Sequence, residues 1–94
     1  MAEGSGRRPV RLFFTSHFRR QSSRLPPNAK RALAHALRLF RANPADPRLR
    51  LHKLSGRFED SWTFAFGHDA RVVFQWDGNI AVILDVGGHD EVYG

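Results

Sequence analysis

The spacing of apolar residues changes once along this chain, and the change constrains the fold more than any other feature. From Asn28 to Ala42 the apolar positions are 29, 32, 33, 36, 37 and 40, which follow the period of a helix. The segment NPADP, at 43–47, is predicted to end this helix. Beyond it apolar residues alternate with polar ones, as in strands that bury one face. The pattern predicts an α+β fold in which this helix packs on a sheet.

Three short strands are predicted in the second half of the chain, at 61–66, 70–76 and 80–86. The dipeptide Asp77-Gly78 is a strong signal for a hairpin between the last two. The last strand is apolar on both faces, as an interior strand should be. The face toward the helix would carry Trp62, Phe64 and Phe66 from the first strand and Val72, Phe74 and Trp76 from the second.

The first half of the chain adds one strand and one helix to this arrangement. The strand is predicted at Val10–Thr15, and Ser16 is the predicted N-cap of a short helix that buries Phe18. The segment LPP, at 25–27, ends that helix and begins the long one, because proline suits the first helical turn. The expected order is β-α-α-β-β-β, with two N-terminal helices packed on a roughly four-stranded antiparallel sheet.

Length and composition favour a single soluble domain. The 94 residues include no cysteine, which excludes a disulfide framework and thiolate zinc sites and fits a cytoplasmic protein. We expect a flexible tail at 1–9 and one domain at 10–94. The apolar runs are too short to cross a bilayer, and the arginine-bearing N-terminus lacks the apolar stretch of a signal peptide, so we expect no membrane association.

Positive charge is concentrated in residues 1–57, which carry 14 basic and two acidic side chains. Residues 58–94 carry one basic and seven acidic side chains, and the whole chain has a net charge of +6. Such an excess favours a polyanion as partner, either a nucleic acid or an acidic protein. The alternative is a solvated helix surface that is basic without a partner.

Arg71 is the single basic residue of the second half and lies inside a predicted strand. Because Val72 and Phe74 face the helix, Arg71 faces the other side of the sheet. A charge in the middle of a sheet is retained only where it is exposed or paired. A salt bridge to Asp85 or Asp69 and a functional role are both compatible with this position.

Three further stretches could place titratable and charged side chains on the same face as Arg71. They contribute His52, Lys53 and Arg57 from LHKLSGR, His68 from HDAR, and His89, Asp90, Glu91 and Tyr93 from the last segment. Metal-free RNA cleavage needs an acid, a base and cations that stabilise the phosphorane, and histidine titrates near neutral pH. Ordinary surface or core-covering roles stay open for each residue. Consecutive residues rarely ligate one ion, so we expect no metal and no cofactor.

Residues 51–93, LHKLSGRFEDSWTFAFGHDARVVFQWDGNIAVILDVGGHDEVY, resemble the C-terminal half of the RelE/ParE superfamily of toxins from type II toxin–antitoxin systems. The shared pattern is a Leu-x-Gly loop, a tryptophan-containing strand, an Arg-Val-Val-Phe strand, a Leu-Asp-Val-Gly stretch and a terminal His-Asp-x-x-Tyr. The first half is similar too, with a strand, a helical hairpin split by Leu-Pro, and an Asn-Pro stop. The resemblance covers roughly residues 10–93.

The resemblance implies a RelE-like fold and an endoribonuclease, an mRNA interferase, that cuts mRNA in the ribosomal A site and is held inactive by a cognate antitoxin. By position, Arg71 matches a strand arginine that contacts the scissile phosphate. His89 and Tyr93 match C-terminal residues used for acid–base work or for orienting the nucleotide. His52 matches a loop histidine of YafQ-like members, and Lys53 falls where RelE-like members place a cation.

The resemblance leaves the acid and the base unassigned. We favour His89 in one role and His52 in the other, with Arg71 and Lys53 stabilising the transition state and Tyr93 bonding to or stacking on the nucleotide. The antitoxin would cover the basic surface as an acidic segment that folds as it binds. Cations expected to dock on ribosomal RNA are Arg57, Lys30, Arg31, Arg38 and Arg41.

Two other functions are compatible with the resemblance. ParE-like members share the fold but inhibit DNA gyrase by binding it, and the histidines at 52 and 89 argue against that function here. The other alternative is an inactive member that binds only its antitoxin or a nucleic acid. Such a protein would not slow growth when it is expressed without its partner.

Overall fold

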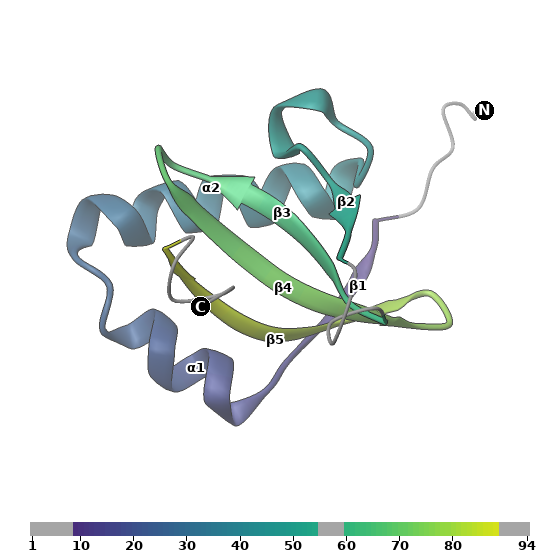
Figure 1. Ribbon diagram of the computed structural model, residues 1–94, viewed down its shortest axis with the longest axis horizontal. Helices are drawn as coiled ribbons and strands as arrows, with labels where there is room; N and C mark the ends of the chain where they lie inside the picture. The colour runs from purple at the N-terminus through teal and green to yellow at the C-terminus, as the bar shows by residue number, and fades with distance from the viewer. Residues whose placement is uncertain (1–8, 55–59, 89–94) are drawn as a thin grey trace.

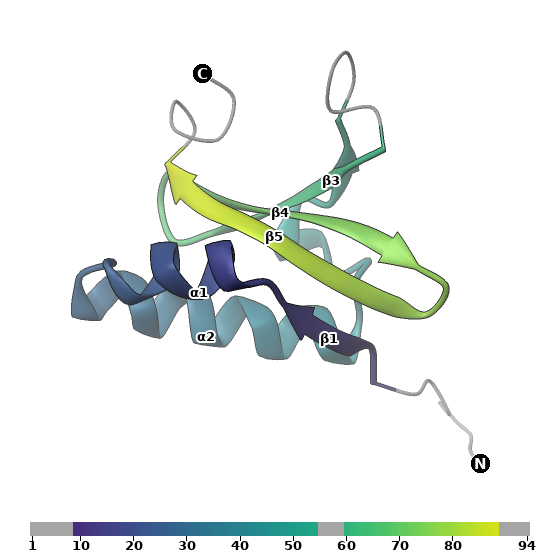
Figure 2. The same cartoon turned by 90° about the horizontal axis from the view of Figure 1, so that it is seen from below.

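The computed structural model describes residues 9–54 and 60–88, in which two α-helices lie on one side of a five-stranded sheet (Figures 1 and 2). The helices are α1 (Ser16–Ser23) and α2 (Pro27–Ala42), followed by a short 3-10 helix, η1 (Pro47–Leu49). The strands are β1 (Arg11–Phe14), β2 (His52–Lys53), β3 (Trp62–Phe66), β4 (Ala70–Asp77) and β5 (Ile80–Gly88).

The predicted α+β class and the two helices on an antiparallel meander are confirmed, with two differences in the sheet. The strand order is β1-β5-β4-β3-β2, and β1 runs parallel to β5 while the other pairs are antiparallel. The short strand β2 adds a fifth strand, which periodicity cannot reveal because it has two residues. The helices between β1 and the meander return the chain across the sheet, which lets β1 pair with the last strand.

Helix α2 presents the predicted apolar stripe to the sheet, with Leu33, Ala36 and Phe40 buried. Phe40 is fully buried and stacks on Phe64, with 4.6 Å between ring centroids, and it meets the edge of Phe74 at 4.9 Å. These contacts confirm that Phe64 and Phe74 lie on the sheet face toward the helices. Burying each aromatic side chain stabilises the folded state by about 2–3 kcal/mol, so the three rings hold α2 against β3 and β4.

Helix α1 begins one residue earlier than predicted, because Thr15 and not Ser16 is its N-cap. The backbone of Thr15 is extended, and its Oγ1 accepts a hydrogen bond from the Phe18 N–H at 3.1 Å. The same hydroxyl donates to the Ile83 carbonyl of β5 at 3.0 Å, so Thr15 joins the helix to the sheet. Phe18 is buried as predicted.

The predicted hairpin between β4 and β5 forms, but its two turn residues are Gly78 and Asn79, one position later than the predicted Asp77-Gly78 pair. Asp77 pairs with Ile80, and Gly78 has a φ of +60°, which favours glycine in a two-residue turn. The strand β5 lies between β1 and β4, as its apolar sequence predicted. No helix in the described ranges is long and apolar enough to cross a membrane.

Candidate active site

The candidate site lies on the sheet face that does not carry α1 and α2, which we call the helix-free face (Figure 2). Directly paired residues on neighbouring strands share a face, so the register places side chains on it. One row across the sheet contains Ala65, Arg71 and Gly87, and the next contains His52, Thr63 and Val73. Asp85 pairs with Val73 beside a register shift between β4 and β5, so the pairing alone does not fix the direction of its side chain.

Arg71 lies on the helix-free face, as predicted, and is half-buried. Its Nη1 donates a hydrogen bond to the carbonyl oxygen of Ala70 at 3.1 Å. Within residues 9–54 and 60–88, no carboxylate forms an ion pair with this guanidinium. The described structure therefore does not contain the salt bridge to Asp85 or Asp69 that was the structural alternative.

Asp85 interacts instead with His17, which the sequence analysis did not predict as a partner. Its Oδ1 lies 3.1 Å from Nε2 of His17 and accepts a hydrogen bond from the Val86 N–H at 2.8 Å. His17 is on the first turn of α1, which contacts β5 where β1 no longer pairs with it. The two residues are 68 positions apart in the chain, and no local motif links them.

His52 shares the helix-free face with Arg71, because it pairs directly with Thr63. The two residues lie two strands and about two residues apart, which corresponds to roughly 12 Å between their Cα atoms. Nδ1 of His52 is 3.1 Å from the Arg50 carbonyl oxygen, which can only accept. Nδ1 therefore carries the proton, and the lone pair of Nε2 in the neutral ring is available as a base.

The other predicted site residues do not join this pair in the described structure. Lys53 pairs with Trp62, so the register directs it to the helix side of β2 and separates it from Arg71. Arg57, His89 and Tyr93 lie outside the described residues. Gly88, the last described residue of β5, pairs with Ala70 next to Arg71, so the chain leaves the described structure at the side of this arginine.

The cations of α2 lie on the other side of the molecule from Arg71. Lys30, Arg31, Arg38 and Arg41 are all exposed on the helix, as the sequence predicted. A ligand bound at Arg71 and a ligand bound along α2 would therefore lie on different surfaces. Among the described residues, no three histidine, aspartate or glutamate side chains gather as ligands of a metal would.

Comparison with solved structures identifies this architecture. A chain of the toxin–antitoxin complex RelBE2 from Mycobacterium tuberculosis superposes with a TM-score of 0.72 at 21% identity, over 86% of this chain and 99% of that one. The chain has the RelE fold. No family model matches the sequence, and no curated protein matches it either.

Two further structures place the same fold among named toxins. YafQ from E. coli strain BL21(DE3) matches with a TM-score of 0.67 at 11% identity, over 90% of this chain and 99% of YafQ. The YoeB/ParE toxin from Agrobacterium tumefaciens matches with a TM-score of 0.69 at 14% identity, over 85% of this chain and 99% of that toxin. The described helices and strands thus have the RelE arrangement.

Proposed function

We propose that this protein is the toxin of a type II toxin–antitoxin system, a member of the RelE/ParE superfamily, and that it cleaves mRNA in the ribosomal A site. The observation that carries the proposal is Arg71, a guanidinium without a carboxylate partner in the described residues, on the helix-free face of a RelE fold. A half-buried cation without a counter-ion among the described residues is suited to bind an external anion, and the two non-bridging oxygens of a phosphodiester can accept hydrogen bonds from the planar fork of donors of a guanidinium.

The proposed reaction is an attack by the ribose 2′-oxygen on the adjacent phosphorus. A base removes the 2′-OH proton, the bond from phosphorus to the 5′-oxygen breaks, and an acid protonates that oxygen. The products are a 2′,3′-cyclic phosphate and a free 5′-OH. No water, metal or cofactor enters this step. The guanidinium of Arg71 stabilises the charge that builds on the phosphorane oxygens.

His52 fits the role of base, because its Nδ1–H is held by the Arg50 carbonyl and its Nε2 is available. His89 is then the proposed acid and Tyr93 the residue that binds the nucleotide. Lys53 is on the edge strand and exposed, on the other face from Arg71, so we propose that it holds the RNA backbone outside the reacting phosphate.

The distribution of charge is consistent with a cytoplasmic protein that acts within the ribosome. The exposed cations Lys30, Arg31, Arg38 and Arg41, together with Arg57, would contact ribosomal RNA while the opposite face receives the mRNA. The proposed partner is an acidic antitoxin, and several structures with this fold are toxin–antitoxin complexes. Binding should weaken as salt rises, because phosphate contacts release counter-ions.

The test is expression without a partner, followed by primer extension on mRNA from translating ribosomes. We expect discrete new 5′ ends with the unchanged protein and about a 100-fold loss with Arg71→Ala, the loss typical of removing one group that stabilises an oxyanion. The matched control is Arg24→Ala, an exposed arginine at the end of α1 that the site does not use. Circular dichroism would show that both variants are folded.

Two outcomes would contradict the proposal. Full cleavage by Arg71→Ala would remove this arginine from the mechanism. Inhibition of gyrase supercoiling with uncut mRNA would instead establish the ParE-like function.

A further inference from the structure

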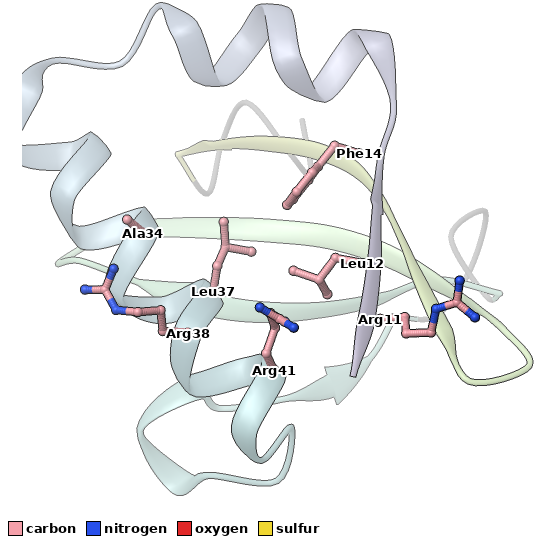
Figure 3. A pocket seen from close by; sticks show the side chains of 7 residues that line it. All are labelled: Arg11, Leu12, Phe14, Ala34, Leu37, Arg38 and Arg41. Carbon is pink, nitrogen blue, oxygen red and sulfur yellow. The ribbon is translucent and has the colours of Figure 1, made fainter. Parts of the chain in front are cut away.

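Phe13 is an aromatic residue that the edge strand β1 leaves 59% exposed. Its neighbours Leu12 and Phe14 point toward α2 and line the cavity between β1 and that helix, whereas Arg11 extends to the other side of the strand (Figure 3). Because side chains alternate along a strand, Phe13 lies on the same side of β1 as Arg11, away from α2. The ring therefore belongs to the helix-free face.

The register of the sheet places Phe13 on the same face as Arg71. Phe13 pairs with Val82 of β5, which pairs with Gln75 of β4. Gln75 and Arg71 are four residues apart in β4, and Gln75 follows Phe74, whose ring contacts α2, so both lie on the helix-free face. The Cα atoms of Phe13 and Arg71 are two strands and four residues apart, which corresponds to roughly 16 Å.

The residues around the ring combine one apolar side chain with two polar ones. Val82 is half-buried beside it, and Arg11 and Gln75 are exposed. Nε2 of Gln75 donates a hydrogen bond to Oγ of Ser61 at 3.2 Å, and within residues 9–54 and 60–88 its Oε1 accepts none. Arg11 forms no ion pair in the same ranges. We call Arg11, Phe13, Val82 and Gln75 the Phe13 strip.

A single exposed apolar residue is ordinary on a protein surface, so the chemistry around Phe13 decides what it fits. Trp76, the other large apolar residue exposed in the described ranges, stacks on Phe40 on the helix side of the sheet, so Phe13 is not part of a wide apolar patch. A protein partner usually needs such a patch. A nucleobase does not, because its flat face stacks on one aromatic ring while a cation and an amide bind its phosphate and its polar edge.

Two carboxylates lie near the route from Arg71 to the Phe13 strip. Asp85, on β5, is held beside α1, where its Oδ1 lies 3.1 Å from Nε2 of His17, and a protonated His17 would offset its charge. Asp77 is at the end of β4, beside the hairpin. The strip itself contains no acidic residue, so the positive charges of Arg71 and Arg11 mark the two ends of the route, which suits a polyanion.

We propose that the Phe13 strip binds one unpaired base of the mRNA whose phosphate lies at Arg71, with the base stacked on the ring of Phe13. This site depends on the proposed function, which brings the mRNA to Arg71. A stacked strand advances about 3.4 Å per nucleotide, so the roughly 16 Å between the two residues correspond to about five nucleotides, and to fewer in an extended strand. The base would therefore lie outside the dinucleotide that is cut, and Phe13 would hold the substrate without taking part in bond breaking. Every base has a face that can stack, so the strip should tolerate different sequences.

Two RNAs of different length test the distance between the strip and Arg71. Both carry 2′-O-methyl groups, which remove the nucleophile and prevent cleavage. One is a dinucleotide, and the other has about six nucleotides, enough to reach from Arg71 to Phe13. We expect the full chain to bind the longer RNA more tightly, and Phe13→Ala to weaken that binding about tenfold, the scale of one base–aromatic stack, while the dinucleotide binds both proteins equally.

Fluorescence reports both affinity and stacking. Anisotropy of an end label measures the affinity of each RNA. A 2-aminopurine base in the longer RNA should lose fluorescence when it binds the unchanged protein, because stacking on an aromatic ring quenches it. The same RNA bound to Phe13→Ala should keep its fluorescence.

Three variants separate stacking from other contacts. Phe13→Tyr keeps an aromatic ring and should bind the longer RNA as the unchanged protein does. Phe13→Leu keeps a large apolar side chain without a π-face, so it should lose most of the affinity that Phe13→Ala loses. Arg24→Gln removes an exposed charge at the end of α1, outside the strip, and should leave the effect of RNA length unchanged.

Equal affinities of Phe13→Ala and the unchanged protein for the longer RNA would overturn the inference. Full binding by Phe13→Leu, unchanged fluorescence of 2-aminopurine, or no binding of the longer RNA would overturn it too. A dimer in sedimentation that Phe13→Ala dissociates would also overturn it, and would assign the strip to a second copy of the chain.

The binding assay is independent of mRNA cleavage, which programmed ribosomes report separately. A protein that shows the effect of RNA length but cuts no mRNA would contradict the proposed nuclease alone. A protein that cuts mRNA but binds the longer RNA without any contribution from Phe13 would contradict the Phe13 strip alone.

Discussion

Two polar side chains on the helix-free face lack the partners that buried polar groups usually have. Among residues 9–54 and 60–88, Arg71 makes a single hydrogen bond, to the neighbouring carbonyl of Ala70, and the fully buried Oγ1 of Thr63 has no partner. A buried hydroxyl without a hydrogen bond costs about 1–3 kcal/mol. The alternation of the strands was enough to predict the face of Arg71. The pairing of His17 with Asp85 was not predictable, because it depends on how α1 meets β5.

The same substitution, threonine to valine, should have opposite effects on stability at positions 63 and 15. Thr63→Val replaces the unpaired hydroxyl by a methyl group of similar shape and should raise the free energy of unfolding by roughly 1 kcal/mol. Thr15→Val removes the cap of α1 and the bond to β5, and it should lower that free energy by about 1–2 kcal/mol. Urea denaturation measures both. A destabilised Thr63→Val would mean that the hydroxyl has a partner after all.

The elements that the sequence predicted well are those whose causes are local. The apolar stripe of α2 and the hairpin after β4 each depend on one stretch of chain; the stripe forms where expected, and the turn forms one residue later, at Gly78 and Asn79. The parallel pairing of β1 and the strand β2 depend on distant partners, so local pattern does not reveal them. His52 and Lys53 are neighbours in β2, so they lie on opposite faces of the sheet. The pairing of β2 with β3 decides that His52 is the one on the face of Arg71.

The short helix η1 carries a prediction about pH. Hydrogen bonds from the side chain and the backbone N–H of Arg48 lower the pKa of Asp46 from 3.8 to about 2. A carboxylate whose pKa is depressed in the folded state stabilises it above the unfolded value and loses that effect as pH falls. The stability difference between the unchanged protein and Asp46→Ala should therefore be constant above about pH 5 and shrink between pH 4 and pH 2. Thermal melts across this range measure it, and a difference that does not change with pH would contradict the assignment.

At the scale of the whole molecule, one aromatic core holds together two surfaces of different chemistry. Phe40 meets Phe64, Phe74 and Trp76, and the last of these has its ring centroid 5.9 Å from that of Phe40. The cations of α2 lie on one side of this core and Arg71 on the other. The sequence predicted both the core and the excess of charge. The alternation of β4 also placed Arg71 on the face away from the helix, so the separation of the two sets of cations followed from the same pattern.

The core predicts a large contrast between two phenylalanines. Phe40→Ala should lower the free energy of unfolding by about 3–5 kcal/mol, since it leaves a cavity among the rings. Phe13→Ala, at a side chain that is 59% exposed, should change it by less than about 0.5 kcal/mol. Urea denaturation with circular dichroism measures both. A small effect of Phe40→Ala would contradict the position of this core.

The most direct test of the central claim is the rate at which the purified protein cleaves mRNA in programmed ribosomes. Arg71→Ala should reduce that rate roughly 100-fold, and Arg71→Lys should restore only part of it, because lysine keeps the charge but not the fork of donors. Both variants should melt at nearly the temperature of the unchanged protein. An unchanged rate in folded Arg71→Ala would contradict the account.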